Sequence, residues 1–518
     1  MRNELNDDTV FLGIDAGTTV IKSVLFDASG REVGVAQATV PLEAPQSGWQ
    51  EEDMHSVWAA ARETIGKVLH QTDISPARIR AVAVTGQGGG CWLIDGNGNP
   101  VRNAITWLDG RAAGIVSEWE QSGQAEEMYK ICGSIQYSGL QSAIIRWLAL
   151  HEPETLKAAR HTLWCKDWIK LKLTGKVATD PSEAGISFLD IRTLEYNSEL
   201  LQLMGIEQYQ DLLPPVQGCN EITGTLAPSV AEELGLPEDL VVVGSAFDMM
   251  STAIGVGAVS DGDACSILST SWTNEVVLEK PEIEPLNVGF TICHGVPDHW
   301  VRAMAGMVGT PNLDWFIANF CHQDKAAAEQ AGDDIFAHLE KAASQIPVGS
   351  GGIIYHSYLS PAGERSPFVN ENVKAQFVGL SQDHTRHHLL RAVYEGVALA
   401  SRHAYESIPV AIERVSLSGG GSRSALWCQI LADTLNAEVR VPTGTELGAK
   451  GAVINAMVVL GIYDSHAQAV EQAVEFEKAY YPDADNHSRY SDLYQIYLRT
   501  FESMLGLWDD LARFRKAM

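Results

Sequence analysis

The segment GIDAGTTVIK, residues 13–22, combines residue types that can bind phosphate and a metal ion. Asp15 ends an apolar run, and a carboxylate at that place can hold Mg²⁺ directly or through water. Gly17 permits a tight turn with φ above zero, in which successive N–H groups point at one anion, and the hydroxyls of Thr18 and Thr19 add donors. Lys22 can contact a phosphate as a point charge. The segment predicts a clamp for a magnesium-bound nucleotide, although an ordinary hairpin with a capping aspartate fits it equally well.

A second segment repeats this order of residue types in the other half of the chain. ACSILSTSWTNEVVLEK, residues 264–280, has an apolar run, a turn rich in Ser and Thr, and a second apolar run. Its turn places Ser269, Thr270 and Ser271 where the first segment has Gly17 to Thr19. Two hairpins of similar construction, one opening each half, indicate an internal duplication with a cleft between the halves.

A run of three glycines marks a third candidate site. In SLSGGGSRSALWCQILADTL, residues 416–435, a strand-like run is followed by Gly419, Gly420 and Gly421 and then by a helical pattern. Glycines let a flat ligand lie close to the backbone, and the start of a helix favours negative charge. We expect a ligand-binding turn here, with a tight turn selected for packing as the alternative.

An aspartate also ends the apolar strand pattern in VVVGSAFDMMSTAIGVG, residues 241–257. Folds of the α/β class bind ligands outside the carboxyl ends of their strands, which is where Asp248 is expected. Taken alone, Asp248 fits the N-cap of the helix that follows it. Beside a phosphate clamp, it becomes the leading candidate for a general base.

The elements that must position these residues alternate between strands and helices, which predicts the α/β class. Strands are expected over 9–34, 79–86 and 239–248, and a helix over 52–70. Residues 92–107 predict a hairpin with an Asn-Gly turn. Apolar positions at helical spacing predict a packing helix over 490–514, with the stripe 490, 494, 497, 501, 504, 508 and 511. The Gly- and Asp-rich segment 255–264 is the best candidate for a linker.

Composition excludes several classes of protein. The chain has 518 residues, which favours two or more domains. Its net charge of −29 argues against a nucleic-acid or anionic-membrane surface. The N-terminal segment lacks a secretory pattern, and no apolar run approaches the ~20 residues of a membrane span. Eight scattered cysteines without a C-x-x-C pair are typical of a cytoplasmic protein with reduced thiols.

Together these motifs resemble the FGGY carbohydrate kinases, from about residue 10 to about residue 480. GIDAGTT…K is similar to the family's first phosphate motif, GSAFD to the motif with the catalytic aspartate, and SLSGGGSRSALWCQILADTL to the adenosine motif. YLSPAGERSPFVNENVKAQFVGLS, from residue 358, resembles a signature of the second domain. The resemblance implies two actin-like (ribonuclease H-like) ATPase domains that face a central cleft, residues 1–256 and 257–518.

The resemblance also implies a role for each matching residue. Asp248 would take the proton from a sugar or polyol hydroxyl that attacks the γ-phosphorus of ATP, and Asp15 would help to hold Mg²⁺. The other ligands implied by the family fall into three groups: Gly17, Thr18, Thr19, Lys22 and Thr270 for the phosphates, Gly420, Gly421 and Ser422 for adenosine, and Gln87 and Trp107 for the acceptor. Such transfer depends mainly on positioning and on charge neutralisation.

The segment GQGGG limits the range of acceptor molecules that the resemblance implies. Glycerol kinases have an Arg-Glu pair after this glutamine and D-xylulokinases have Met-His, whereas this chain has Gly88 and Gly89 after Gln87. The pattern resembles the erythritol kinases and L-xylulose kinases, and CKDWIKLKLTG and TDPSEAG also resemble erythritol kinase. We therefore expect phosphorylation of a primary hydroxyl of a four- or five-carbon polyol or ketose of the erythritol or xylulose type, with another pentulose such as ribulose as the alternative.

A non-catalytic, actin-like sugar sensor that binds ATP is the competing class, and the presence of both Asp15 and Asp248 argues against it. The expected partner is a small sugar or polyol, with no nucleic acid and no membrane, and the sequence leaves a homodimer open. His384, His387 and His388 have spacings that metal ligands use, but no carboxylates cluster with them, so solvated or capping roles are favoured. GNGNP, residues 96–100, predicts a hairpin turn rather than a nucleotide loop.

Overall fold

The computed structural model describes residues 9–516 and shows a mixed α/β fold, as the sequence predicts. The chain forms two compact units. The first contains the chain up to Asp261 together with Val277–Arg302 and Thr443–Glu475, and the second contains Gly262–Val276, Ala303–Pro442 and the segment from Phe476 onward. Two later segments therefore return to the first unit.

The first unit is built on a six-stranded sheet with the order β3-β2-β1-β5-β10-β9. The strands are β1 (Val10–Ala16), β2 (Val20–Asp27), β3 (Glu32–Thr39), β5 (Ile79–Gly86), β9 (Ile222–Thr225) and β10 (Val241–Gly244). Neighbours pair antiparallel from β3 to β1, parallel from β1 through β5 to β10, and antiparallel from β10 to β9. Because β1, β5 and β10 are parallel, their carboxyl ends lie at one edge of the sheet.

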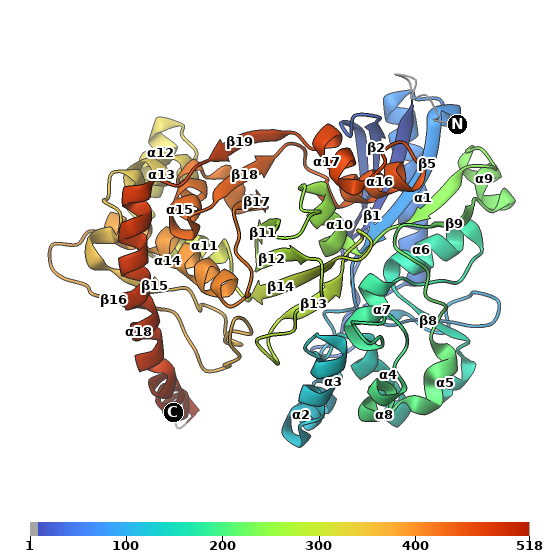
Figure 1. The fold of residues 1–518 in the computed structure, drawn as a ribbon, viewed down its shortest axis with the longest axis horizontal. Coiled ribbons are helices and arrows are strands. Elements are labelled where there is room, and N and C mark those ends of the chain that lie inside the picture. The colour runs from blue at the N-terminus through green and yellow to red at the C-terminus, as the bar shows by residue number, and fades with distance from the viewer. Residues whose placement is uncertain (1–8, 517–518) are drawn as a thin grey trace. The chain divides into compact units, whose positions relative to one another are not determined.

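Period-two alternation along these strands divides the core of the first unit into two layers. Leu12 and Ile14 of β1 pack in a cluster with α1 (Met54–Thr72) and α6 (Cys165–Thr174). Phe11 of β1 instead packs with α16 (Leu447–Val459). Figure 1 shows α16, coloured near the red end of the bar, beside the blue strands β1 and β5, which it contacts. Helices therefore cover both faces of this sheet.

Smaller elements complete the first unit. A second hydrophobic cluster holds the region from Cys91 to Leu212 together. The remaining helices are α2 (Ala113–Ser122), α3 (Gln124–Cys132), α4 (Gln141–His151), α5 (Pro153–Ala158), α7 (Pro181–Ser187), α8 (Ser198–Met204), α9 (Pro228–Leu234), α10 (Asp248–Gly255) and α17 (His466–Ala473), with 3₁₀ turns at Pro76–Arg78 and Glu207–Leu212. The short strands are β4 (Glu51–Glu52), β6 (Trp92–Ile94), β7 (Ala104–Ile105), β8 (His161–Leu163) and β13 (Phe290–Cys293).

The second unit repeats the strand order of the first. The second sheet has seven strands in the order β13-β14-β12-β11-β17-β18-β19, and its six strands from β14 to β19 match the first sheet, with β11 antiparallel to β12 and parallel to β17, β17 parallel to β18, and β18 antiparallel to β19. They are β11 (Ala264–Leu268), β12 (Trp272–Leu278), β14 (Trp300–Gly306), β17 (Arg414–Ser418), β18 (Glu438–Pro442) and β19 (Phe476–Tyr480). The correspondence of β1 with β11 and of β5 with β17 agrees with the internal duplication expected from the two hairpins.

Helices and a small two-stranded sheet accompany these strands. They are α11 (Pro311–Phe320), α12 (His322–Ala331), α13 (Ile335–Ser344), β15 (Ile354–His356), β16 (Gln376–Val378), α14 (Arg386–Glu406), α15 (Ala425–Leu435) and α18 (Ala484–Lys516), with 3₁₀ turns at Ser350–Gly352 and Gly420–Arg423. The expected C-terminal helix is α18, and it starts earlier than predicted. Most of its apolar stripe is buried, but Leu511 is 44% exposed because the last turns leave the aromatic cluster that ends at Trp508.

One further expectation is confirmed and another needs correction. The hairpin expected over 92–107 folds back through the Asp95–Asn99 turn, its arms meet at the antiparallel bridges Ile94–Pro100 and Cys91–Ile105, and β6 also pairs with β8. The strand expected over 239–248 is only β10, since the chain leaves the ladder at Gly244 and α10 starts at Asp248. The buried segment between them, residues 245–247, has no regular secondary structure.

Candidate active site

The turn after β1 brings the predicted phosphate ligands together in the first unit. Gly17 does not adopt the positive φ expected for it; glycine is favoured instead by space, because a Cβ atom would lie 3.0 Å from the carbonyl oxygen of Val20. Thr18 accepts a hydrogen bond at its Oγ1 from Trp107 Nε1, at 2.9 Å. That bond leaves the Thr18 hydroxyl hydrogen available to a second acceptor. Thr19 is exposed.

Asp15 lies at the end of β1, opposite Lys22 in the β1–β2 register. Burial raises the pKa of Asp15 to about 6, while Lys22 opposes the rise and Glu446 adds to it. A Cβ atom on Gly448 would lie 3.0 Å from Asp15 Oδ2 and 3.5 Å from Thr252 Oγ1 of α10. Glycine at 448 therefore lets α16 approach the Asp15 carboxylate closely, since a side chain at this position would crowd Asp15 Oδ2.

The amino group of Lys22 is held by a carboxylate. Lys22 Nζ lies 2.7 Å from Glu446 Oε2, and the glutamate side chain is only 11% exposed. Glu446 precedes α16, so this ion pair joins strand β2 to the segment that returns to the first unit late in the chain. The predicted contact of Lys22 with phosphate stays a prediction, and it requires the amino group to be shared with Glu446.

Asp248 is the first residue of α10, at the carboxyl end of β10. Phe247, not Asp248, takes the N-cap position, and Asp248 Oδ1 accepts a hydrogen bond from the N–H of Met249 at 2.7 Å. The side chain is half-buried. Because Thr252 stands one helical turn after Asp248 and next to Gly448, the helix that carries Asp248 also runs past the Asp15 carboxylate.

The segment before Asp248 is fixed by hydrogen bonds from two sides. Thr85 Oγ1, near the end of β5, donates to the carbonyl oxygen of Ala246 at 2.8 Å, and Ser251 Oγ donates to the same oxygen at 2.7 Å. The N–H of Phe247 donates to Ser182 Oγ at 3.1 Å. Bonds to consecutive residues hold the backbone that leads into Asp248 in one conformation, which suits a group that must meet a reacting hydroxyl.

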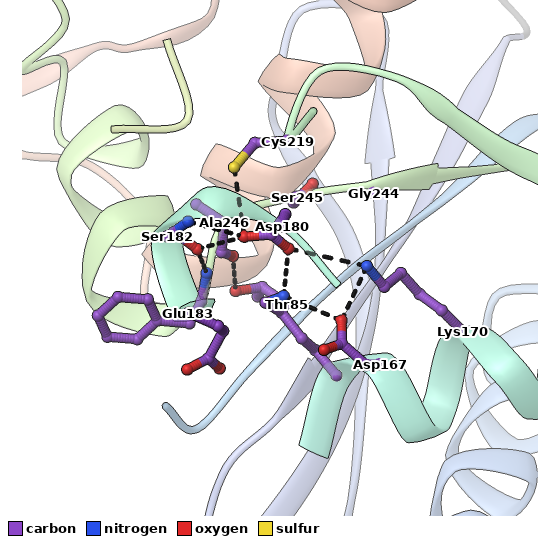
Figure 2. Close-up of polar contacts among 12 residues, drawn as sticks. Thr85, Asp167, Lys170, Asp180, Ser182, Glu183, Cys219, Gly244, Ser245 and Ala246 are labelled. Carbon is purple, nitrogen blue, oxygen red and sulfur yellow. Dashed lines mark hydrogen bonds and ion pairs between the residues drawn. The ribbon is translucent and has the colours of Figure 1, made fainter. Parts of the chain in front are cut away.

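A buried ion network supports Ser182, as Figure 2 shows. Ser182 Oγ donates to Asp180 Oδ1 at 2.6 Å, and Asp180 pairs with Lys166 and, at 3.7 Å, with Lys170. Both lysines also pair with Asp167, at 3.1 and 2.9 Å. Burial alone would raise the pKa of Asp180, but the two lysines outweigh it and lower that pKa. The network keeps its charges balanced within the core and ends at the backbone before Asp248.

The GQGGG segment follows β5 at the same edge of the sheet. Gln87 Nε2 donates to both carboxylate oxygens of Glu52, at 2.9 and 3.2 Å. Burial raises the pKa of Glu52 to about 8, and the bond from Gln87 partly opposes this. The N–H of Gly89 donates to Glu183 Oε2 at 3.1 Å. The sequence interpretation missed both glutamates, since neither belongs to a recognisable motif for acceptor binding.

Trp107 lies across this segment. A Cβ atom on Gly89 would lie 3.1 Å from Trp107 Cβ and from Tyr137 Oη, and one on Gly139 would collide with the carbonyl oxygen of Trp107 at 1.8 Å. The tryptophan is 40% exposed, and its indole N–H is the group that binds Thr18. One side chain thus joins the predicted acceptor site to the predicted phosphate turn. Tyr137 is a further residue of this region that the sequence interpretation missed.

In the second unit, hydrogen bonds join the turn that contains Thr270 to the residues just before α11. The N–H of Gly309 donates to the carbonyl oxygen of Thr270 at 2.9 Å, and the N–H of Thr310 donates to that of Ser269 at 2.7 Å. A Cβ atom on Gly309 would lie 2.4 Å from the Ser269 oxygen, so only glycine permits this approach. Neither Gly309 nor Thr310 was predicted, although the Gly-Thr-Pro sequence before a helix is a recognisable helix start.

The three glycines after β17 lie beside the same turn. Gly419 has a φ of 87°, and a Cβ atom on it would lie 2.5 Å from the carbonyl oxygen of Leu268, at the end of β11. Gly420 and Gly421 start a 3₁₀ turn that separates β17 from α15. A Cβ atom on Gly420 would meet Thr310 Cγ2 at 4.0 Å. Ser422 is half-buried, and its Oγ donates to the carbonyl oxygen of Gly419 at 2.8 Å.

The histidines with metal-like spacing have structural partners. His388 completes a capping box with Thr385 at the start of α14, and His384 Nδ1 accepts the N–H of Ser381 at 3.0 Å. His387 Nε2 lies 3.1 Å from Asp324. Across residues 9–516, no group of three or more His, Cys, Asp or Glu side chains is arranged to hold a metal ion. The favoured capping role is thus confirmed for His388.

The described part of the chain holds no helix that is long and apolar enough to cross a membrane.

The repeated sheet and the glycine turns at its carboxyl ends define the two-domain, actin-like (ribonuclease H-like) ATPase fold. Models of the FGGY family of carbohydrate kinases match the chain, the N-terminal domain over residues 10–255 and the C-terminal domain over residues 270–460. The chain belongs to this family and is a carbohydrate kinase, an enzyme that transfers a phosphoryl group to an alcohol.

Individual relatives agree with the family. Erythritol kinase from Brucella abortus (strain 2308) is 31% identical, covering 97% of this chain and 98% of the relative. L-xylulose/3-keto-L-gulonate kinase from Escherichia coli (strain K12) is 29% identical, covering 96% and 97%. The crystal structure of xylulose kinase from Rhodospirillum rubrum superposes with a TM-score of 0.87 at 27% identity, covering 96% of this chain and all of that structure.

Proposed function

We propose that the chain transfers the γ-phosphoryl group of ATP to a primary hydroxyl of an uncharged four- or five-carbon polyol or ketose, of the erythritol or xylulose type. The observation that carries this proposal is the meeting of Asp15, Asp248 and the GQGGG segment at one edge of the first sheet. The relatives named erythritol kinase and L-xylulose kinase support the choice of acceptor. Another pentulose such as ribulose is the alternative acceptor.

Asp248 would act as the general base. Its place at the start of α10 lets it receive a proton from the attacking hydroxyl while the fixed segment before it holds its position. Gln87 and Trp107 would bind the acceptor. The polar groups of Gln87 and the indole face of Trp107 suit a molecule with hydroxyls on an aliphatic chain.

Asp15 would hold the Mg²⁺ ion that accompanies ATP, and that ion would neutralise charge on the phosphates. The fit rests on the half-buried carboxylate and on the Thr252 hydroxyl, because both lie close to Gly448 and both offer oxygen ligands. Gly17, Thr18, Thr19 and Lys22 would contact the transferred phosphate through N–H, hydroxyl and ammonium donors. All of these groups belong to the first unit.

The second unit would supply the remaining nucleotide contacts. Thr270 would donate to a phosphate, while Gly420, Gly421 and Ser422 would border the adenosine. The domain division at residues 256 and 257 separates these two tasks, and the family models that meet between residues 255 and 270 support it. The eight buried, free cysteines support a cytoplasmic location, and a homodimer remains a proposal.

A coupled assay of ADP release tests this function. The panel contains glycerol, erythritol, ribitol, and the D- and L-forms of xylulose and ribulose. We expect erythritol or a xylulose to raise ADP release well above the rate with water alone and above the rate with glycerol. If glycerol is the best acceptor, or if no acceptor raises the rate, the proposed substrate class is wrong.

A further inference from the structure

The backbone of the GQGGG segment is packed so closely that residues 88 and 89 can contribute no side chain. A Cβ atom on Gly88 would lie 2.5 Å from the ring of Phe247, the residue before Asp248. Gly89 has a φ of 74°, a conformation that favours glycine, and a Cβ atom there would crowd Trp107. Polar groups that recognise the acceptor at this place must therefore come from other elements.

Glu183 of α7 is a polar side chain that reaches this segment from another element. Its Oε2 accepts the N–H of Gly89, and its side chain is 1% exposed. Figure 2 shows the carboxylate of Glu183 turned away from Asp180 and Lys170. Glu183 Oε1 has no hydrogen-bond partner among the described residues. The side chain is thus anchored through one oxygen and leaves the other unpaired.

Gln87 has the same arrangement. Its Nε2 is held by Glu52, the side chain is 3% exposed, and its Oε1 has no hydrogen-bond partner within the described part of the chain. A buried polar atom without a partner costs free energy, so proteins retain few of them without a functional reason. Two unpaired oxygens, one on Gln87 and one on the glutamate that binds Gly89, lie near the predicted base and suit a ligand that carries several hydroxyl groups.

The surroundings favour a ligand without charge. Burial raises the pKa of Glu52 to about 8 and that of Glu183 well above its ordinary value, and the same loss of hydration would penalise a carboxylate on the ligand. Lys166 is the cation that most opposes the rise in the pKa of Glu183, and its amino group already pairs with Asp167 and Asp180. A protonated Glu183 can donate as well as accept, which matches the two roles of an alcohol.

We propose that Glu183 Oε1 and Gln87 Oε1 form hydrogen bonds with hydroxyl groups of the acceptor, and that Glu183 thereby selects uncharged polyols and ketoses over sugar acids of the same length. This proposal rests on the proposed function, since it assigns a recognition residue to the same acceptor site. Glu183 takes the place of side chains that Gly88 and Gly89 lack.

The first test compares two buried glutamates by steady-state kinetics, with the best neutral acceptor of the panel. Glu183→Leu removes both oxygens, and we expect the KM for the acceptor to rise about tenfold or more while the KM for ATP changes less than about twofold. Glu183→Gln keeps two polar atoms and restores most of the acceptor affinity. The matched control is Glu275→Leu, since Glu275 is also 1% exposed and has an unpaired Oε1 in the described structure, but lies on β12 of the second unit.

The second test uses the unaltered protein, so it holds even if Glu183→Leu does not fold. Thermal stabilisation by erythritol is compared with that by erythronate, in which a carboxylate replaces one terminal CH₂OH group. Binding of erythronate at least about tenfold weaker supports the proposal, and equal or tighter binding overturns it. An acceptor KM in Glu183→Leu that equals the KM in Glu275→Leu also overturns it, while leaving the proposed function intact. The proposed function itself fails if no neutral acceptor is phosphorylated by the unaltered protein.

Discussion

In each unit a glycine-rich segment passes close to the carboxyl end of a central strand, β1 in the first unit and β11 in the second. The two glycine-rich turns have different surroundings. A Cβ atom on Gly86 would lie 2.8 Å from the carbonyl oxygen of Ala16, and one on Gly419 would lie 2.5 Å from that of Leu268. The turn in the first unit is bordered by the buried side chains of Gln87, Glu52 and Glu183. Beside the second turn lie the backbone of Leu268 and the Cγ2 methyl group of Thr310.

The two hairpins that open the units differ in the same way. Asp15 pairs in register with Lys22 in the first hairpin, whereas Ile267 pairs with Thr273 in the second. The first hairpin thus carries an ionisable pair at the position where the second carries an apolar and a hydroxyl side chain. The two units share the close approach of the backbone but differ in these side chains, and we expect proton transfer in the first unit and neutral contacts in the second.

Replacing the predicted base, Asp248, should have the largest effect on catalysis and tests the proton-transfer task of the first unit. Asp248→Asn keeps the shape of the side chain but removes the proton acceptor, so we expect kcat to fall by a factor on the order of 10² or more. ATP binding, measured by calorimetry, should stay nearly unchanged because Asp248 is expected to contact the acceptor and not the nucleotide. Full activity of the variant would move proton transfer to another residue.

Adding a methyl group to each glycine turn tests whether the two turns have separate tasks. In Gly88→Ala the new Cβ atom meets the Phe247 ring, so we expect Asp248 to shift and kcat to fall about tenfold. In Gly421→Ala it meets the side chain of Leu268 instead, and we expect a higher KM for ATP with little change in the KM for the acceptor. Steady-state kinetics with both substrates varied distinguish the two effects.

Gly66→Ala is the control for these variants, because a Cβ atom at this position of helix α1 meets no atom within 4 Å. Its kinetics should match those of the unaltered protein. If Gly88→Ala and Gly421→Ala raise the same KM, the two turns do not have separate tasks.

The buried acids of the first unit predict how stability depends on pH. The folded protein holds the proton of Glu52 up to about pH 8, whereas the unfolded chain releases it near the ordinary value of 4.5. Since the folded state binds more protons in this window, the Glu52 contribution to the free energy of unfolding falls as pH rises from 4.5 to 8. Between pH 6 and pH 8, the free energy of unfolding should therefore decrease by about 1–3 kcal/mol less in Glu52→Gln than in the unaltered protein.

Urea unfolding at several pH values measures this difference, and the slope of each unfolding curve should remain unchanged. Parallel pH profiles for the variant and the unaltered protein would show that Glu52 is ionised in the folded state.

Removing one hydroxyl from the network behind Asp248 should have the smallest effect. Ser182→Ala leaves the N–H of Phe247 without its acceptor, so we expect the free energy of unfolding to fall by about 1 kcal/mol and kcat to fall severalfold. Ser503→Ala on the exposed side of α18 is the control and should change stability by less than about 0.5 kcal/mol. A loss of stability without any change in kcat would limit the network to a structural role.

Local pattern was sufficient to predict the elements that carry the site. β5 spans the predicted residues 79–86, because its apolar run is buried on both faces of the sheet, and the turn at Gly17–Thr19 follows β1 as expected. The strand before Asp248 was predicted too long, since residues 245–247 are apolar or small and buried yet have no regular secondary structure. Burial alone does not distinguish a strand from such a segment.

Contacts between residues far apart in the sequence could not be predicted from local sequence patterns. Glu183 binds Gly89 across 94 positions, and Lys22 binds Glu446 across 424. The pairing of β6 with β8 depends on how the segment up to His161 packs. Motif spacing indicated which residues are chemically able to act, but the partners that orient them follow from the fold.

The most direct test of the account is ³¹P NMR of the reaction of ATP with erythritol or the best acceptor of the panel, without decoupling from protons. Transfer to a primary hydroxyl predicts a new phosphomonoester signal split into a triplet by the two protons of one CH₂ group, and this signal should be nearly absent with Asp248→Asn. Release of inorganic phosphate alone, or a doublet from a secondary hydroxyl, would contradict the account.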